Sequence, residues 1–523
     1  MAKRHVRLRR TLAVATSALV TGTAVVAGAS VAQASPVSWG PCDRAALEEV
    51  PITERHLFSC AKYPVPVDHA DPGKGTVDIA MMRRAATEQT GRIGSLFLNP
   101  GGPGGAGFDM PVGAVDRFDP AVLKRFDIIG FDPRGIDRST RMRCFANGEQ
   151  AEEVLGRMSS VPVTGEQISS TMDAYGDYGD ACAKNAGELQ RHMSTADVAR
   201  DLDLMRAGVG DEQLNFVGFS YGTLLGATYV ATFPERSRAI VLDGNVDPAL
   251  RTADGVQHDR ERAGGFELAL DGFLQRCAAE AGKCAFGEGD VRAKFDEIRT
   301  VLRRGPITMP DGSKITLDQF TDGVSSALYD PEQFRQLASD LQALHLQLHP
   351  EAGLIPDLLR VLHLPSGKHR FDGGDAEESY VDDSYFAVNC TDKPIPKTPE
   401  RVPAIAAQWE AESPTFGRTQ AFSDLAGCSQ WPPTSPDVHR GPWENRAANP
   451  VLLFGNSYDP ATRYEFSRRM EKELGNARLV SVDAFGHCIL GDSSCADSRA
   501  ADYLINLRVP QPGEVCQPDQ QPF

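Results

Sequence analysis

Basic residues are scarce relative to acidic residues in this chain. Its 523 residues include 54 lysines and arginines against 71 aspartates and glutamates, which gives a formal net charge of -17 at pH 7. A protein of this charge repels polyanions such as DNA. We therefore expect no nucleic-acid partner.

Long hydrophobic runs are also missing beyond the N-terminal segment, because no other stretch approaches the run of about 18 apolar residues that indicates a membrane-spanning helix. No internal repeat with a period of about 20 to 50 residues is evident. Glycine (49) and proline (35) are only modestly above average, which argues against a collagen-like or disordered chain. With 41% hydrophobic residues, the composition indicates a globular protein with a large core.

The first 34 residues have the features of a secretory signal peptide. A basic run over 3–10 is followed by an apolar stretch of small residues over 11–29 and by Ala32-Gln33-Ala34, which suits signal peptidase. The alternative, a membrane anchor, is disfavoured because Thr, Ser and Gly dilute the stretch. We expect cleavage after Ala34 and export to the extracellular medium without a stable anchor. The Arg9-Arg10 pair leaves the choice between the Sec and twin-arginine routes open.

The chain has no CxxC pair, a spacing typical of zinc ligands, but it has eleven cysteines. Cysteines of exported proteins tend to form disulfides, and an odd count leaves at least one thiol free. Spacing does not determine the connectivity. Pairing of sequence neighbours predicts Cys42 with Cys60, Cys144 with Cys182, Cys277 with Cys284, Cys390 with Cys428 and Cys495 with Cys516, with Cys488 free.

Short apolar runs alternate with helical patterns, as a parallel sheet covered by helices requires. Runs bounded by Gly, Pro, Asn or Asp predict strands over 76–82, 95–98, 126–131, 214–218, 239–242, 451–454 and 478–482. Helices are predicted over 195–205, 221–232, 464–474 and 496–507. Between 251 and 440 the strand signals fade and helical segments are broken by Gly and Pro, which predicts an inserted, mostly helical cap. The core then comprises two parts, 35–250 and 441–523.

The motif Gly218-Phe219-Ser220-Tyr221-Gly222 follows a predicted strand and opens a predicted helix, the setting of a nucleophile elbow. A match to this five-residue pattern often arises by chance, so the pattern alone is weak evidence for a nucleophile. Its position between a predicted strand and a predicted helix makes the evidence stronger. Bulky residues at Gly218 or Gly222 would clash where the strand meets the helix. Ser220 is therefore the candidate nucleophile.

A serine hydroxyl needs a base to take its proton, and the base needs an acid that orients it. Asp459 follows the predicted strand 451–454, and His487 follows the predicted strand 478–482. Both lie beyond the carboxyl ends of strands, where an open α/β sheet places its ligands. The alternative is that Asp459 only opens a turn before Pro460 and that His487 is a packed loop residue.

A loop rich in glycine, Asn99-Pro100-Gly101-Gly102-Pro103-Gly104-Gly105, follows the strand 95–98. It can supply a backbone N–H to the oxyanion of a tetrahedral intermediate, and the amide of Tyr221 can supply a second. Phosphate binding is the alternative, but the loop lacks the Lys-Ser/Thr ending of a P-loop and its prolines remove donors.

These motifs occur together with Phe131-Asp132-Pro133-Arg134-Gly135 and Leu242-Asp243-Gly244 in one order along the chain. In that order the sequence resembles the secreted bacterial tripeptidyl aminopeptidases, α/β-hydrolases of the proline iminopeptidase clan. The resemblance covers nearly all of the mature chain. It departs at Pro100-Gly101, where relatives usually carry His-Gly or a similar pair.

The resemblance implies an α/β-hydrolase fold and release of short peptides, tripeptides in this family, from free N-termini. Ser220, Asp459 and His487 would form the triad, and the amides of Gly102 and Tyr221 the oxyanion hole. Asp132 and Arg134 would form an internal ion pair that braces the loop. No cofactor and no metal are expected.

An exopeptidase must compensate the charge of the substrate's ammonium group, which calls for a carboxylate. The segment 372–392 is rich in acids, namely Asp372, Asp375, Glu377, Glu378, Asp382, Asp383 and Asp392. We predict Asp392 as the ammonium ligand, with a solvated acidic loop as the alternative. The aromatic residues Tyr380, Tyr385 and Phe386 either line the pocket or fill the core of the cap. Two other functions compete: a carboxylesterase or lipase on the same scaffold, and a binding protein without activity.

Overall fold

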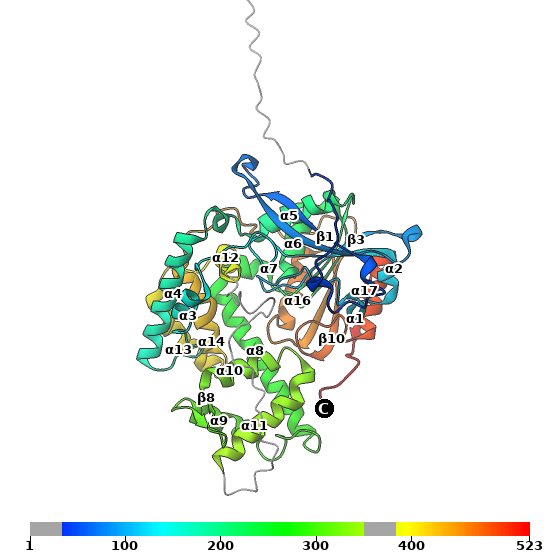
Figure 1. The fold of residues 1–523 in the computed structure, drawn as a ribbon. Coiled ribbons are helices and arrows are strands. Elements are labelled where there is room, and N and C mark those ends of the chain that lie inside the picture. The colour runs from blue at the N-terminus through cyan, green and yellow to red at the C-terminus, as the bar shows by residue number, and fades with distance from the viewer. Residues whose placement is uncertain (1–33, 350–382) are drawn as a thin grey trace, which may run out of the picture. The chain divides into compact units, whose positions relative to one another are not determined.

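The computed structural model describes residues 34–349 and 383–523, so the predicted signal peptide and most of the acid-rich segment, including Asp372, Asp375, Glu377, Glu378, Tyr380 and Asp382, lie outside the described residues. A sheet of nine strands forms the centre of this part of the chain, in the order β1-β2-β4-β3-β5-β6-β9-β10-β11 (Figure 1). The strands are β1 (Phe58–Pro66), β2 (Thr76–Arg84), β3 (Gly94–Asn99), β4 (Phe126–Phe131), β5 (Leu214–Phe219), β6 (Ser237–Asp243), β9 (Val451–Tyr458), β10 (Ala477–Phe485) and β11 (Val515–Cys516).

In this sheet the pairs β1–β2 and β2–β4 are antiparallel, and the other pairs are parallel. The central strands are buried on both faces, which explains why they read as continuous apolar runs. Phe97 and Phe216 point into the core on one face, whereas Leu98 and Val217 point into the core on the other. The predicted, mostly parallel sheet is confirmed.

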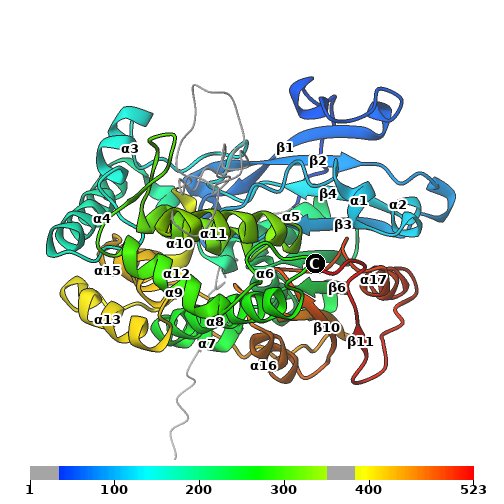
Figure 2. The ribbon, with the colours of Figure 1, turned by 90° about the horizontal axis from the view of Figure 1, so that it is seen from below.

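Helices cover both faces of the sheet. α5 (Thr195–Gly208), α6 (Gly222–Thr232) and α16 (Tyr464–Leu474) share one core with the strands. α1 (Ala114–Arg117), α2 (Pro120–Arg125) and α17 (Ser494–Asn506) lie on the other side (Figure 2). The chain thus forms a sheet between two layers of helices.

The seven predicted strands correspond to β2, β3, β4, β5, β6, β9 and β10, and the four predicted helices to α5, α6, α16 and α17. The prediction missed β1, which contains Pro64 and Pro66. Proline cannot donate to a neighbouring strand and is confined to edge positions, and β1 is the edge of the sheet. The two-residue strand β11, at the opposite edge, was missed as well.

The chain between β6 and β9 is mostly helical. Its elements are α7 (Pro248–Ala253), α8 (Gly255–Ala279), α9 (Val291–Leu302), α10 (Leu317–Ala327), α11 (Phe334–Leu348), α12 (Ser384–Asp392), α13 (Val402–Glu412), α14 (Gly417–Gln420) and α15 (Ala426–Gln430), with a two-stranded sheet of β7 (Ile307–Thr308) and β8 (Lys314–Ile315). Many of these helices pack around a second hydrophobic core. α3 (Gly148–Leu155) contacts α4 (Gly165–Asn185), which in turn packs on α15. The domain boundaries predicted at 250 and 440 stay a prediction.

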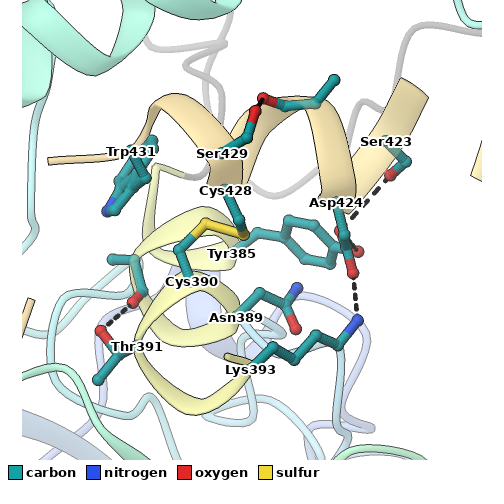
Figure 3. The surroundings of a disulfide bond; sticks show 12 residues. Tyr385, Asn389, Cys390, Thr391, Lys393, Ser423, Asp424, Cys428, Ser429 and Trp431 are labelled. Atoms are coloured by element: carbon teal, nitrogen blue, oxygen red, sulfur yellow. Dashed lines mark hydrogen bonds and ion pairs between the residues drawn. A yellow bond between two sulfur atoms is a disulfide. The ribbon is translucent and has the colours of Figure 1, made fainter. Parts of the chain in front are cut away.

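The five predicted disulfides are confirmed, and Cys488 is the free cysteine among the described residues. Cys390–Cys428 joins α12 to α15 across a sequence separation of 38 residues (Figure 3). Cys277–Cys284 closes a separation of only 7 residues at the end of α8. Within residues 34–349 and 383–523, no helix is long and apolar enough to cross a membrane.

Removing Cys390–Cys428 should destabilise the protein more than removing Cys277–Cys284, because a longer loop loses more entropy when it is closed. The double variant Cys390→Ala/Cys428→Ala should lose about 4 kcal/mol and Cys277→Ala/Cys284→Ala about 2 kcal/mol. Urea unfolding of both variants and of the parent measures this difference. Equal losses would show that loop length does not govern the contribution of these two bonds.

Candidate active site

Ser220 lies between β5 and α6 in a strained backbone conformation. Its φ of 55° falls in the left-handed region that residues with a side chain rarely adopt. The serine is partly exposed, and its backbone N–H donates to the carbonyl oxygen of Asp243 at 2.9 Å. The predicted strand, turn and helix around this residue are therefore present, with the serine at the sharpest point of the turn.

The glycines of the motif leave no room for a side chain. A Cβ at Gly218 would lie 2.3 Å from the carbonyl oxygen of Gly222, and a Cβ at Gly222 would lie 2.9 Å from the carbonyl oxygen of Asn99. Both contacts are with backbone atoms, which cannot rotate away. The steric reason predicted for these two glycines is confirmed.

Asp459 and His487 form a hydrogen-bonded pair beyond the ends of β9 and β10. Nδ1 of His487 lies 2.9 Å from Oδ2 of Asp459. The Asp459 carboxylate is fully buried and also accepts hydrogen bonds from the hydroxyl and backbone N–H of Thr462 and from the N–H of Ala461. With its proton on Nδ1, the imidazole presents the lone pair of Nε2, and this atom is buried without a hydrogen-bond partner.

The charge of Asp459 controls the protonation of His487. Burial has the largest single effect and by itself would lower the pKa of the imidazole, but the Asp459 carboxylate and the Cys488 sulfur together outweigh it, so that the pKa of His487 lies well above its ordinary value. Burial raises the pKa of the Cys488 thiol to about 11. Cys488 is therefore protonated at neutral pH and is no competing thiolate nucleophile.

Asp243 and the glycine after it connect the serine to the histidine. While the Asp243 carbonyl oxygen accepts from Ser220, its Oδ2 accepts the backbone N–H groups of Ile489 and Leu490 at 2.8 and 2.9 Å. A Cβ at Gly244 would lie 3.1 Å from Cε1 of His487. No hydrogen bond joins Ser220 to His487 among the described residues, but Asp243 contacts both loops: its carbonyl oxygen accepts the Ser220 N–H, and its carboxylate accepts two N–H groups of the loop that follows His487. The sequence motif contained Asp243, yet its role was not predicted.

Two further groups hold the histidine loop. Nδ2 of Asn456 donates to the carbonyl oxygens of Gly486 and Cys488, on either side of His487. From the helical insertion, the carbonyl oxygen of Tyr329 accepts the N–H of His487 at 2.9 Å, and the Tyr329 ring packs edge-on against the imidazole with centroids 5.2 Å apart. The insertion therefore contacts the candidate base directly.

The glycine-rich loop after β3 lies against the nucleophile turn. A Cβ at Gly101 would lie 2.8 Å from Cβ of Ser220 and 3.0 Å from the backbone nitrogen of Tyr221. Gly101 and Gly102 have φ values of 97° and 101°, which favour glycine. The N–H groups of Gly102 and Tyr221 donate to no other group in the described part of the chain, so both are available to a substrate oxygen.

The predicted ion pair between Asp132 and Arg134 is wrong. Arg134 is completely buried and makes two hydrogen bonds to Asp201, with Nε to Oδ2 at 2.7 Å and Nη2 to Oδ1 at 2.6 Å. Asp132 instead accepts the backbone N–H groups of Gly107, Phe108 and Arg138. Burial raises the pKa of Asp132 to about 7. Asp132 does brace the loop after β3, but through backbone hydrogen bonds.

Asp392 is buried at the end of α12 and contacts the nucleophile turn indirectly. Its Oδ2 accepts from the Thr195 hydroxyl at 2.5 Å and its Oδ1 from the Thr195 N–H at 3.2 Å. The Thr195 hydroxyl is also bonded to the hydroxyl of Tyr221, whose ring lies under the Arg251 guanidinium. Burial raises the pKa of Asp392 to about 6. The ammonium-binding role of Asp392 stays a prediction, since these contacts also fit a group that anchors α12.

The other described acids near α12 are engaged as well. Lys393 is buried between Asp259, at 2.6 Å, and Asp424, which also accepts from the Tyr385 hydroxyl at 2.8 Å (Figure 3). Asp383 accepts from the N–H of Cys144. Phe386 stacks on Trp431 at 5.7 Å between ring centroids. Tyr385 and Phe386 thus pack inside the helical region.

Two groups of described side chains have the composition of a metal site. Cys144, Cys182 and Asp383 form one, but its two sulfurs are joined in a disulfide. Glu297, His345 and His349 form the other. The expectation that the chain has no metal site included the statement that no histidine lies four residues from another; this was wrong, because His345 and His349 have that spacing, which is the signal that could have indicated the group.

The candidate residues fall within regions that match known protein families. Residues 94–281 match the family of the alpha/beta hydrolase fold, and residues 413–516 match the family described as TAP-like protein. The first region contains the glycine-rich loop and Ser220, and the second contains Asp459 and His487.

Three curated relatives align with nearly the whole chain. The chain is 31% identical to the serine protease Hip1 of Mycobacterium tuberculosis, over 92% of this chain and 91% of the relative. It is 30% identical to a carboxylesterase B of Mycobacterium tuberculosis, over 92% and 90% of the two chains. It is 28% identical to a tripeptidyl aminopeptidase of Streptomyces lividans, over 95% and 90%. The predicted resemblance is confirmed: the chain belongs to the α/β-hydrolase family of serine peptidases that includes Hip1 and the tripeptidyl aminopeptidases.

Proposed function

We propose that this protein is a secreted serine exopeptidase that releases tripeptides from the free N-termini of peptides. Ser220 is the nucleophile, His487 the general base and Asp459 the acid that orients it. The observation that carries this proposal is the hydrogen-bonded pair of Asp459 and His487, whose loop is joined through Asp243 to the strained turn at Ser220. A serine at a strained turn, with a histidine and a buried acid on a connected loop, supports acyl transfer as the reaction.

The reaction follows from these positions. Nε2 of His487 takes the proton of the Ser220 hydroxyl while Oγ attacks the scissile carbonyl carbon. The N–H groups of Gly102 and Tyr221 donate to the oxyanion of the tetrahedral intermediate. His487 then gives the proton to the leaving amine. In the second half-reaction His487 takes a proton from the water that attacks the acyl carbon, and it returns this proton to Oγ of Ser220 as the acyl group leaves. Asp459 stabilises the imidazolium that forms in each half-reaction.

Secretion is supported by two independent features. The N-terminal segment has the basic, apolar and small-residue parts of a signal peptide. Five disulfides join ten of the eleven cysteines, which is typical of proteins that fold in an oxidising compartment.

The preference for a free N-terminus is supported by the tripeptidyl aminopeptidase relative and by the acidic character of the chain. A carboxylesterase is the second candidate, because a relative of 30% identity bears that name. The two functions share the triad and differ in whether the substrate's ammonium group contributes to binding.

Substrates with and without a free amine distinguish these functions. We expect the protein to cleave a tripeptide p-nitroanilide with a free amine at least about tenfold faster, in kcat/KM, than the same compound with an acetylated amine. A carboxylate in the site would pair with the ammonium group of the first substrate, whereas the neutral acetylated amine would leave that carboxylate unpaired. Equal rates on the two peptides, or turnover of p-nitrophenyl acyl esters alone, would contradict the exopeptidase function.

The same substrates test Asp392. If its carboxylate binds the ammonium group, Asp392→Asn should raise KM for the free-amine peptide and leave the residual rate on the acetylated peptide unchanged. If Asp392 only anchors α12 to Thr195, both substrates should be affected alike. The buried Asp424→Asn variant, which removes a charge from the same helical region, serves as the matched control.

Replacing the nucleophile should abolish turnover. Ser220→Ala should lower kcat by a factor on the order of 10⁴ or more, because no other group of the site can form the acyl-enzyme. Initial rates on the free-amine peptide measure the loss, and the exposed Ser169→Ala on α4 provides a control with the same change in chemistry. Activity retained in Ser220→Ala would remove the proposed mechanism, whichever substrate is used.

The raised pKa of His487 predicts the pH dependence. The imidazole acts as a base only when it is unprotonated, so kcat/KM should rise with pH through a midpoint above the ordinary imidazole value of 6.5. Asp459→Asn removes the charge that stabilises the imidazolium, so the midpoint should move to lower pH while the maximal rate falls by about 10⁴. Rate profiles from pH 5 to pH 10 measure both changes. If the midpoint of the rise in kcat/KM does not shift in Asp459→Asn, the rise reports the titration of a group other than His487.

A further inference from the structure

Three side chains of the types that bind zinc converge where α9 meets α11, two helices that lie side by side in the insertion (Figures 1 and 2). Glu297 comes from α9, His345 lies in the last turn of α11, and His349 follows that helix. Nε2 of His349 lies 3.1 Å from both carboxylate oxygens of Glu297, and Nε2 of His345 lies 3.5 Å from Oε2. All three ligand atoms lie within 4.8 Å of one another.

These distances match the spacing of ligands around zinc. Zn²⁺ binds histidine nitrogen and carboxylate oxygen at about 2.0 to 2.2 Å in tetrahedral sites, which places the ligand atoms about 3.3 Å apart. The two measured nitrogen-to-oxygen distances, 3.1 and 3.5 Å, lie on either side of that value. An ion therefore fits between the three side chains after small rotations of the imidazoles.

Packing between α9 and α11 fixes the backbone that carries two of the ligands. Ile298 and Leu344, the residues next to Glu297 and His345, are buried in the hydrophobic core between these helices. The ring of His345 packs edge-on against Phe286, with centroids 6.5 Å apart. His349 comes directly after α11, four residues beyond His345. Two of the three ligands therefore lie on packed helices and the third at the end of one of them.

The charges at this position favour a cation. In the described part of the chain, the Glu297 carboxylate makes no ion pair with lysine or arginine, and its side-chain hydrogen bonds and ion pairs are with the two imidazoles. Lys294, one turn earlier on α9, donates to the Phe286 carbonyl oxygen at 2.8 Å and to Gln342 at 3.3 Å. The chain as a whole carries a net charge of -17.

The ligand set also indicates which cation binds. Two imidazoles and one carboxylate suit Zn²⁺, whereas Mg²⁺ and Ca²⁺ prefer sites made of oxygen ligands alone. The exposed fractions of Glu297, His345 and His349 are 43%, 19% and 43%, so an ion can enter from solvent and keep water in its fourth position.

We propose that Glu297, His345 and His349 form a zinc site that links α9 to α11. The ion replaces hydrogen bonds between the imidazoles and the carboxylate by three coordinate bonds. It thereby adds coordinate bonds to the apolar packing and the Lys294–Gln342 hydrogen bond that connect these two helices of the insertion. This site is separate from the proposed triad, so its test does not depend on the peptidase function.

Binding of Zn²⁺ to the tag-free, chelator-treated protein tests the proposal. In competition with a chromophoric chelator, we expect one equivalent of Zn²⁺ to bind, and Co²⁺ in its place to give the visible absorption of a tetrahedral site. The melting temperature should rise with zinc concentration and remain unchanged with Mg²⁺ or Ca²⁺, because an ion that binds only the folded state stabilises it.

Variants then locate the ion. His345→Gln/His349→Gln should weaken zinc binding at least about tenfold and remove the rise in melting temperature, since loss of a supporting group alone costs that much. His192→Gln is the matched control, because His192 also lies near carboxylates, 3.4 Å from Glu188 and 4.0 Å from Asp68, but belongs to neither group of metal-binding composition among the described residues. It should bind zinc like the parent.

A folded double variant that binds zinc as tightly as the parent would overturn the proposal, as would the absence of saturable binding to the parent. If the double variant fails to fold, as judged by circular dichroism, the single variant Glu297→Gln, which keeps an oxygen that can accept hydrogen bonds, must weaken binding at least about tenfold for the site to stand.

Discussion

The geometry of the candidate site depends on one buried residue at the end of β6. The backbone carbonyl of Asp243 holds the N–H of Ser220, and its carboxylate holds two N–H groups of the loop that follows His487. β6 lies between β5, which leads to the serine, and β9, which leads to the acid. Burial raises the pKa of Asp243 to about 6, while the two N–H groups favour its charged form. The loops that carry Ser220 and His487 are therefore joined through one buried residue.

Close backbone approach is the second constraint. The glycine-rich loop, the nucleophile turn and the end of β6 meet at Gly101, Gly218, Gly222 and Gly244, where a Cβ would lie within about 3 Å of other atoms. The strain at Ser220 persists because these neighbours leave the turn no alternative path. The same close contacts hold Gly101 against the backbone nitrogen of Tyr221, one of the two N–H groups that the proposed mechanism uses.

The helical insertion is coupled to both ends of the site. Tyr329 contacts His487 through its carbonyl oxygen and its ring, and Asp392 connects to Tyr221 through Thr195. Substrate that binds against the insertion can therefore affect the base and the nucleophile turn together. The buried acids of this region, such as Asp259 and Asp424 on either side of Lys393, are occupied by internal partners, which is why acidic composition did not by itself locate an ammonium site.

The roles assigned to Ser220, Asp459 and His487 stay predictions, but most strands of the main sheet, the tight turn at Ser220 and all five disulfides could be predicted from the sequence by itself. Each of these depends on local patterns, on the order of motifs or on neighbouring cysteines, and such features can be recognised without knowledge of the fold. Only the tertiary structure decided that Arg134 pairs with Asp201, that Asp392 bonds to Thr195, that Asp243 joins the loops of Ser220 and His487 and that Glu297 meets His345 and His349. These contacts join side chains from separate elements, and their partners are determined by how the packed helices and strands meet rather than by any spacing along the chain.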